Sequence, residues 1–350
     1  MTDFGYCHAR IRGMKSRLLD ADFFDRLLAA REASEIASLL GETSYSGDIH
    51  HGLLGQPGAG GIEEGLRLNL AATFSRILSF VDGEARRLIE VLLERWDVQN
   101  IKTILRGKHV GAAPGEIIGS LVPAGTIAEG TLVSLAKEPD IKAAIDLMAT
   151  WGIRHSRPLT RNFSTYVNSH SLAEMEVALD KDYYSGALDA VKGRSFNASL
   201  VRDLVRRQID FSNIMALLRL ANEATQEQAA KFFIEGGREI DRDRFDRLSE
   251  AGQIENIVDG LTDTTYSDQL VEGLELYKSA NSFAAIERLL EEQTVRKTIG
   301  LFRSDPLSLA PAIAYLWAKV NEIINIRIVL RAGEAGMPIP AIRETLILTN

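Results

Sequence analysis

A short pattern occurs three times in this chain, and no other feature of the sequence constrains the fold as strongly. It reads acid-x-x-Asn-Ile-x-x-aliphatic-Leu-Arg, and it starts at Asp97, Asp210 and Glu322. The copies follow one another at about 110 residues, well beyond the roughly 20–50 residues of a solenoid repeat. A unit of that length is large enough to have a small core of its own. The pattern therefore predicts three copies of one structural unit.

Shorter matches support the same period. Thr43-Ser-Tyr45-Ser recurs as Thr264-Thr-Tyr266-Ser, two periods further on. Ile127 and Ile240 follow the motif arginines of the first and second copies at equal intervals. We therefore predict repeat units at residues 1–112, 113–225 and 226–350, the last of which includes a C-terminal tail.

The repeated units are predicted to be helical. Apolar residues fall near one helical stripe in residues 85–107, 200–221 and 312–332. The chain contains no proline between Pro158 and Pro306, and this region is rich in good helix formers. We find no convincing run of alternating strand residues. The predicted fold is all-α, with three similar helical domains in a pseudo-threefold, funnel-like arrangement that can enclose a central hollow.

The motif residues are interpreted first as structural. Asparagine is a poor helix former because its side chain competes for backbone hydrogen bonds, so its return in three helices predicts a bond to a neighbouring helix or loop. The acid lies on an adjacent face, and the arginine points to roughly the opposite side. We expect the arginine to serve the helix C-terminus or a carboxylate of another helix. The predicted structural residues are Asp97, Asn100, Asp210, Asn213, Glu322 and Asn325.

The composition of the chain argues against several classes of protein. The chain has 350 residues with a formal net charge of −8, and 45% of its residues are hydrophobic, as in ordinary globular proteins. The acidic balance argues against nucleic acid as the main partner. Cys7 is the single cysteine, so neither an intramolecular disulfide nor a cysteine zinc cluster can form. No run of apolar residues is long enough to predict a membrane span.

The sequence motifs of common catalytic sites are missing. No phosphate-binding loop, dinucleotide fingerprint, nucleophile elbow or H-E-x-x-H motif occurs. The glycine-rich residues 47–61 are interpreted as a mobile loop. His50 and His51 are adjacent, so they diverge on any helix and are a poor metal site. We therefore predict no catalytic, cofactor-binding or metal-binding residues.

At this point the motifs resemble a known family. The opening Tyr6-Cys-His-Ala-Arg-Ile-Arg-Gly-Met-Lys15 resembles the first helix of the C subunit of archaeal and bacterial A/V-type ATPases, the counterpart of the d subunit in eukaryotic V-ATPases. Glu42-Thr-Ser-Tyr45 resembles the next signature of that family. Residues 100–106 and 315–327 resemble its two best-marked blocks. The order and spacing of these motifs agree over essentially the whole chain.

The resemblance implies a funnel-shaped rotor subunit at the cytoplasmic face of the membrane rotor ring. Its hollow would receive the foot of the central shaft, and it would couple ion flow to ATP synthesis, or ATP hydrolysis to ion pumping. Its partners would be the shaft subunits and the proteolipid ring, with indirect attachment to the membrane. The resemblance implies no catalysis, no bound nucleotide and no cofactor.

Two further hypotheses remain open at this stage. The chain could be a free-standing helical scaffold that binds a protein or peptide in its hollow, or an all-α enzyme with a site between repeats. Under the rotor hypothesis, basic side chains are the expected contacts with partner carboxylates. These candidate interface residues are Arg10, Arg12, Lys15, Arg106, Arg219 and Arg331.

Overall fold

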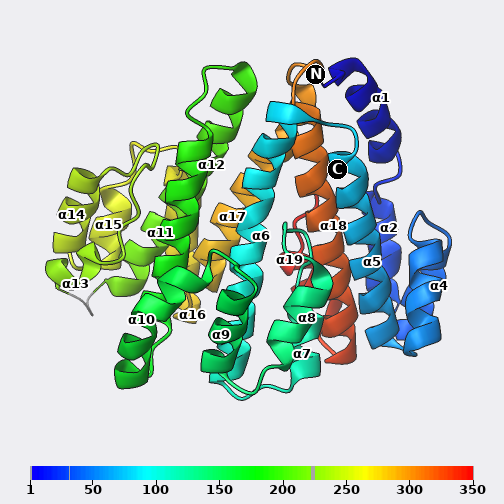
Figure 1. The fold of residues 1–350 in the computed structure, drawn as a ribbon, viewed down its shortest axis with the longest axis horizontal. Helices are drawn as coiled ribbons and strands as arrows, with labels where there is room; N and C mark the ends of the chain where they lie inside the picture. The colour runs from blue at the N-terminus through cyan, green and yellow to red at the C-terminus, as the bar shows by residue number, and fades with distance from the viewer. Residues whose placement is uncertain (1, 31, 222–224, 350) are drawn as a thin grey trace. The chain divides into compact units, whose positions relative to one another are not determined.

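A computed structural model describes residues 2–30, 32–221 and 225–349, and within these ranges every regular element is a helix. This confirms the all-α prediction (Figure 1). The chain divides into two compact units, Met1–Pro139 with Val295–Asn350, and Asp140–Thr294. We call them unit 1 and unit 2. The three sequence repeats are thus distributed over two compact units, and the repeat boundaries at residues 112 and 225 stay a prediction.

Unit 1 contains both ends of the chain. Its helices are α1 (Phe4–Lys15), α2 (Ala21–Ala29), α3 (Ala33–Gly41), α4 (Ser46–Gly55), α5 (Ala59–Leu78), α6 (Gly83–His109), α7 (Pro114–Ser120), α8 (Glu129–Lys137), η1 (Gly300–Arg303), α18 (Ala310–Glu334) and α19 (Ile339–Thr345). Aspartates begin several of them. For example, Asp20 accepts a hydrogen bond from the backbone N–H of Phe23 at 2.8 Å, which caps the N-terminus of α2.

Helix α18 forms the core of unit 1. It contacts α1, α2, α3, α5, α19 and η1, and Figure 1 shows α5 alongside it. Most of its residues are buried, including the polar side chains of Lys319, Glu322, Asn325 and Arg327. Because it is surrounded by other helices, α18 has no wide polar stripe, and its sequence is apolar on nearly all sides.

The glycine-rich segment is helical, so the predicted mobile loop at residues 47–61 is wrong. Helices α4 and α5 pack against each other there, with only a short connection between them. A Cβ atom on Gly52 would lie 2.1 Å from the carbonyl oxygen of Gly61, and a Cβ atom on Gly65 would lie 2.7 Å from that of Asp48. The glycines therefore allow close backbone packing of two helices rather than loop mobility.

Unit 2 is built around α12 (Phe196–Leu220). The other helices are α9 (Ile141–Thr150), α10 (Ser156–Ser169), α11 (Ala173–Ala190), α13 (Gln226–Ala230), α14 (Arg242–Glu250), α15 (Ile254–Asp259), α16 (Ser267–Ala280) and α17 (Ala284–Ile299), whose last residues belong to unit 1. A hydrophobic core joins the end of α12 to the helices that follow it. Phe245 is fully buried in that core, with its ring 5.0 Å from that of Phe233.

Candidate functional site

The first copy of the motif lies on α6 and holds the segment that follows the helix. The side chain of Asn100 donates to the carbonyl oxygen of Val122 at 2.7 Å and accepts from the N–H of the same residue at 2.8 Å. The Asp97 carboxylate accepts from the N–H and hydroxyl of Thr126 and from the N–H of Ile127, at 2.7–2.9 Å. We call such an acid–asparagine pair with its bound backbone a clamp.

The second copy forms the same clamp on α12. Asn213 makes both amide hydrogen bonds to the backbone of Ile234, each at 2.9 Å. Asp210 accepts from the N–H groups of Glu239 and Ile240 at 3.0 Å and from the hydroxyl of Tyr266 at 3.2 Å. Burial raises the pKa of Asp210, although these donors favour the charged carboxylate.

The third copy, on α18, clamps both ends of the chain. Asn325 exchanges two hydrogen bonds with the backbone of Ile347, at 3.0 and 3.2 Å. Glu322 accepts from the N–H of Leu19 and from the hydroxyl of Tyr45, the latter at 2.6 Å. One motif thus binds the C-terminal tail through its asparagine and the N-terminal segment through its acid.

The three clamped residues occupy matching positions in the chain. Ile127, Ile240 and Leu19 each stand directly before the N-cap residue of a helix, namely of α8, α14 and α2. The equal interval from motif arginine to isoleucine, seen in the sequence for Ile127 and Ile240, therefore marks the residue that the acid binds. Leu19 escaped the repeat search because it precedes its acid by 303 residues instead of following it.

Lys319 distinguishes the third clamp from the others. Its ammonium group lies 3.0 Å from Oε1 of Glu322 and 3.7 Å from the ring centroid of Tyr45, and all three residues are buried. Burial lowers the pKa of Lys319 against the opposing influence of Glu322, and burial likewise raises the pKa of Tyr45. The sequence analysis missed Lys319 because a lysine on a helix is ordinarily a solvated residue.

The motif arginines differ in their surroundings. Arg219 pairs with Glu287 at 2.6 Å within unit 2. Arg331 pairs with Glu63 at 2.7 Å and donates to the carbonyl oxygen of Gly119 at 2.7 Å, within unit 1. Arg106 is exposed near the end of α6. At least two of the three therefore contact groups of their own chain.

The basic residues of α1 lie on its exposed side. Arg10, Arg12 and Lys15 are exposed, while Cys7 and Ile11 on the same helix are buried. The guanidinium of Arg10 lies 5.2 Å from the ring centroid of Phe80, and the ammonium group of Lys15 lies 4.1 Å from that of Phe302. These cation–π contacts place the charged group of each side chain against a neighbouring aromatic ring, while both residues stay exposed to solvent.

The described residues give little support to a reactive thiol, a metal site or a membrane-crossing helix. Burial raises the pKa of the Cys7 thiol to about 11, which disfavours the reactive thiolate. Within residues 2–30, 32–221 and 225–349, no group of three His, Cys, Asp or Glu side chains is placed to hold a metal ion. No helix of the described chain is long and apolar enough to cross a bilayer.

Comparison with known proteins gives one consistent result. The model of a family described as ATP synthase (C/AC39) subunit matches residues 7–345. The A-type ATP synthase C subunit of Methanococcoides burtonii is 29% identical over 349 residues, which cover 99% of this chain and 95% of that protein. The proteins of the same name from Methanosarcina acetivorans and Halorubrum lacusprofundi are 30% and 29% identical, and they cover 99% and 98% of this chain, with 93% and 97% of their own length aligned.

Proposed function

This chain belongs to the ATP synthase (C/AC39) subunit family, and we propose that it is the non-catalytic central-stalk subunit that couples the membrane rotor ring to the central shaft. In this role it lies at the cytoplasmic face of the membrane and binds the shaft subunits and the ring proteolipid. It binds neither nucleotide nor cofactor. Its three repeats form a pseudo-threefold body whose hollow receives the shaft.

The observation that carries this proposal is similarity over the whole length of the chain. The aligned relatives are C subunits of A-type ATP synthases, and almost none of this chain or of theirs lies outside the alignments. A local match could reflect one shared helical motif, whereas a match across all three copies of the pattern supports the same role for the whole protein.

The clamps supply a physical reason why such a chain can transmit torque. A coupling subunit must resist bending, and each long motif helix is tied to the segment clamped to it by buried hydrogen bonds. Asp97, Asp210 and Asn213 are fully buried, so these bonds do not compete with water. A body in which long helices are tied to neighbouring segments in this way deforms little under load.

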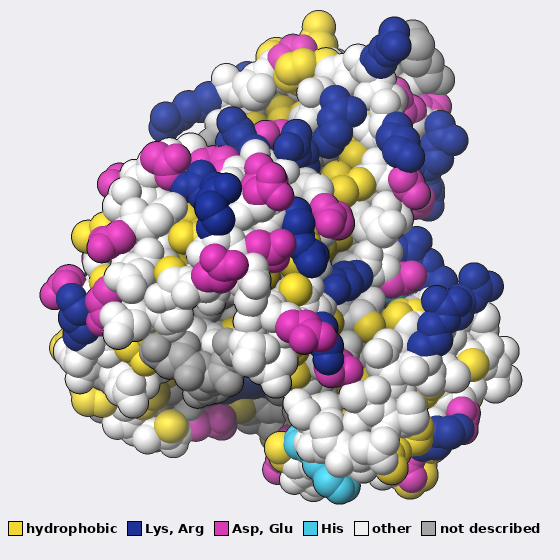
Figure 2. Space-filling view, turned by 90° about the vertical axis from the view of Figure 1, so that its left-hand side faces the viewer, with side chains coloured by type: hydrophobic (Ala, Val, Ile, Leu, Met, Phe, Trp, Pro, Cys, Tyr) yellow, Lys and Arg dark blue, Asp and Glu magenta, His cyan; other side chains and the backbone are white. Residues whose placement is uncertain are grey.

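The expected contacts with partners are polar. On the face that Figure 2 shows, basic and acidic side chains are interleaved and hydrophobic side chains occur in small groups. Arg10, Arg12 and Lys15 are exposed on α1 and can reach carboxylates of a partner. Arg219 and Arg331 contribute less under this proposal, because each already has a carboxylate partner in its own chain.

An affinity pull-down tests the proposal directly. The tagged chain is recovered from detergent-solubilised native membranes, and its partners are identified by mass. The expected result is joint recovery of shaft subunits, ring proteolipid and nucleotide-binding subunits. Recovery of soluble proteins alone, with the ATPase intact in another fraction, would reject the rotor role and favour a free-standing scaffold.

A further inference from the structure

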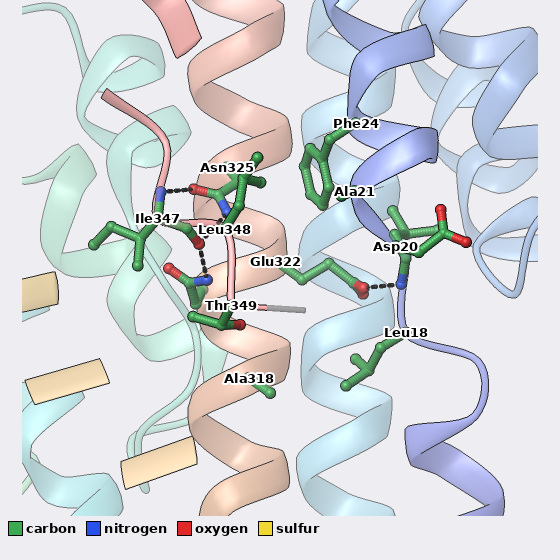
Figure 3. Close-up of a pocket in the computed structure, with 12 residues that line it drawn as sticks. Leu18, Asp20, Ala21, Phe24, Ala318, Glu322, Asn325, Ile347, Leu348 and Thr349 are labelled. Atoms are coloured by element: carbon green, nitrogen blue, oxygen red, sulfur yellow. Dashed lines mark hydrogen bonds between the residues drawn. The ribbon is translucent and has the colours of Figure 1, made fainter. Parts of the chain in front are cut away.

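The charged and polar groups of the third clamp are bound within the chain. Figure 3 shows Glu322 and Asn325 hydrogen-bonded to the backbone of Leu19 and Ile347. The small pocket beside these bonds is lined by the same residues and belongs to the clamp. Charged groups without a partner in the chain lie elsewhere, on the exposed face of α10.

Helix α10 holds the same place in the second repeat as α4 and α16 hold in the first and third. Each of the three is followed by one more α-helix and then by the motif helix, which is α6, α12 or α18. The three begin at Ser46, Ser156 and Ser267, about 110 residues apart. The N-cap residue before each serine has αR backbone angles and makes no side-chain cap. The three helices are therefore equivalent elements of the repeat.

The charge of the exposed face differs among these equivalent helices. In α10, Arg157 and Arg161 are both exposed and lie about one turn apart. Counted from the first serine, the same two positions hold Asp268 and Glu272 in α16, both exposed, and Gly47 and His51 in α4. The second and third repeats therefore present opposite charges at the same positions of one element.

No acid of the described chain neutralises the two arginines of α10. The sequence has no Asp or Glu between Asp146 and Glu174, which is its longest stretch without an acid. Neither Arg157 nor Arg161 forms an ion pair with any residue that the structure describes. Elsewhere a carboxylate one turn away on the same helix pairs with the arginine, as at Arg86, Arg207, Arg242 and Arg288.

The two positive charges are unfavourable for α10 itself. Arg157 lies in the first turn, where the backbone N–H groups carry partial positive charge, and no acid offsets it there. Arg161 follows four residues later, and like charges at that spacing repel each other. Helix α16 forms with acids at both positions, so the arginines are not needed to build this element. A carboxylate from outside the chain would relieve the repulsion.

The face around the arginines is polar and contains no acid. Thr160, Ser164 and Asn168 are exposed and share this face with Arg157 and Arg161 by their helical spacing. The face extends about 16 Å along the helix, and the opposite side of α10 packs against α9 and α11. None of its five side chains is a large apolar group of the kind that inserts into a bilayer. The face therefore suits the carboxylates of a polypeptide.

From these observations we propose that the exposed face of α10 binds an acidic segment of another ATPase subunit, whose carboxylates are spaced about one helical turn apart. The proposal rests on the proposed function and specifies the chemistry of the partner at this surface. The equivalent face of α16 would repel the same segment, because Asp268 and Glu272 hold its two charged positions. Charge thus selects one of three equivalent helices as the docking place.

Charge reversal tests the proposal. Arg157→Asp/Arg161→Glu gives α10 the acids that α16 has, and the tagged chain is titrated into solubilised ATPase stripped of its unaltered copy. We expect about tenfold weaker binding at low salt, because two attractions become repulsions, and a smaller difference at high salt. Arg194→Glu/Arg247→Glu reverses two other exposed arginines of unit 2 and is the matched control. Equal binding by the two variants would overturn the proposal.

The stability of the isolated chain separates docking from a structural role. Because the two arginines repel each other and the helix N-terminus, the Tm of Arg157→Asp/Arg161→Glu should equal or exceed that of the unaltered chain. A lower Tm would show that the arginines stabilise α10 itself, and that result would contradict the proposal.

Photo-crosslinking in the assembled ATPase identifies the partner segment. The photoreactive residue p-benzoylphenylalanine replaces Ser164 on α10 or, as the control, Glu275, which is exposed at the same position of α16. We expect Ser164 to give a crosslink to a partner segment that contains Asp or Glu, and Glu275 to give none to that segment. A lack of partner crosslinks from Ser164, or the same segment from both positions, would reject the surface.

An anionic membrane is the other source of negative charge that this surface could meet. Sedimentation of the isolated chain with vesicles of phosphatidylcholine and phosphatidylglycerol distinguishes it. We expect the unaltered chain and Arg157→Asp/Arg161→Glu to sediment alike. Vesicle binding that the arginine variant loses would assign the face of α10 to the lipid surface instead of a polypeptide.

The two proposals fail in different ways. If the unaltered chain recovers no ATPase subunit, the proposed function is wrong. If the unaltered chain recovers them and the arginine variant binds them equally well, the function stands and only the docking surface on α10 is rejected.

Discussion

Buried polar side chains that bind backbone atoms recur in all three copies of the motif. Asn213 is fully buried, and its amide satisfies both the N–H and the C=O group of Ile234. Buried backbone groups need such partners because no water reaches them. The recurrence of asparagine in the motif follows from this geometry, since its side chain has a donor and an acceptor at the spacing of a peptide group.

Asn213→Ala is expected to lower the free energy of unfolding by about 2–6 kcal/mol, because two buried groups each lose a partner at about 1–3 kcal/mol. Urea unfolding followed by circular dichroism measures the change. Asn256→Ala is the control, since this asparagine bonds a carbonyl oxygen at an exposed site, and its loss should cost below about 1 kcal/mol. Equal losses for the two variants would show that the clamp does not stabilise the fold.

Lys319→Met is expected to destabilise the protein by about 3–5 kcal/mol, because it leaves the Glu322 carboxylate buried without its cation. The double variant Lys319→Met/Glu322→Gln should lose less than the sum of the two single variants, since it removes the uncompensated charge. A double-mutant cycle from chemical denaturation measures this coupling. Strict additivity would mean that the two groups do not interact.

Close packing of glycine faces is the notable feature at the scale of elements. The α4–α5 pair brings two backbones together through Gly52, Gly61 and Gly65. Composition alone favoured a loop, because glycine is both a helix breaker and the smallest residue. The glycines lie in helices here because a second helix packs closely against them, and the sequence does not show which helices pack together.

Gly61→Ala should lower the free energy of unfolding by about 1–3 kcal/mol through overpacking, since its Cβ atom would lie 2.0 Å from the carbonyl oxygen of Gln56. Gly47→Ala in α4 meets no atom within 4 Å and should instead raise stability by up to about 1 kcal/mol. Thermal unfolding of both variants compares the effects. A stabilising effect of Gly61→Ala would refute the close approach of α4 and α5.

At the scale of the whole molecule, two clamps follow the order of the chain and the third does not. The third clamp binds residues near both ends, so the ends belong to one compact unit. The sequence repeats are three, whereas the compact units are two. The two numbers differ because the repeats are defined by similarity of sequence, whereas the compact units are defined by the density of contacts between residues.

Docking of the whole protein onto its partners should depend on the charge of α1. Arg10→Glu/Arg12→Glu is expected to weaken assembly with the other ATPase subunits, with a steep dependence on salt, since exposed charges act through screened attraction. Pull-down at increasing ionic strength measures it. Glu84→Lys/Glu90→Lys on α6 changes as many charges and serves as the control. Unchanged assembly of the arginine variant at low salt would exclude α1 from the interface.

The motif positions could be found from the sequence because their spacing repeats. Asp97, Asn100, Asp210, Asn213, Glu322 and Asn325 were all selected in this way, and their helices are α6, α12 and α18. The backbone groups that these side chains bind could be found only in part from the sequence. Ile127 and Ile240 follow their motif arginines at the same interval, but the sequence does not show that their N–H groups bind the motif acids. Leu19 and Lys319 left no repeat signal, because each belongs to the one clamp that differs from the others.

The sequence by itself determined the helical class, the triplicated motif and the family, because these depend on periodicity and on residue order. Tertiary structure decided which backbone groups each acid and asparagine hold, that the glycine-rich segment is a tight helix pair, and that the chain ends meet on α18. These features arise between residues far apart in the chain, where local pattern carries no information. Burial also changes how strongly a pair of charged residues interacts. Lys319 and Glu322 have a spacing that is common on exposed helix faces, but here they form a buried ion pair.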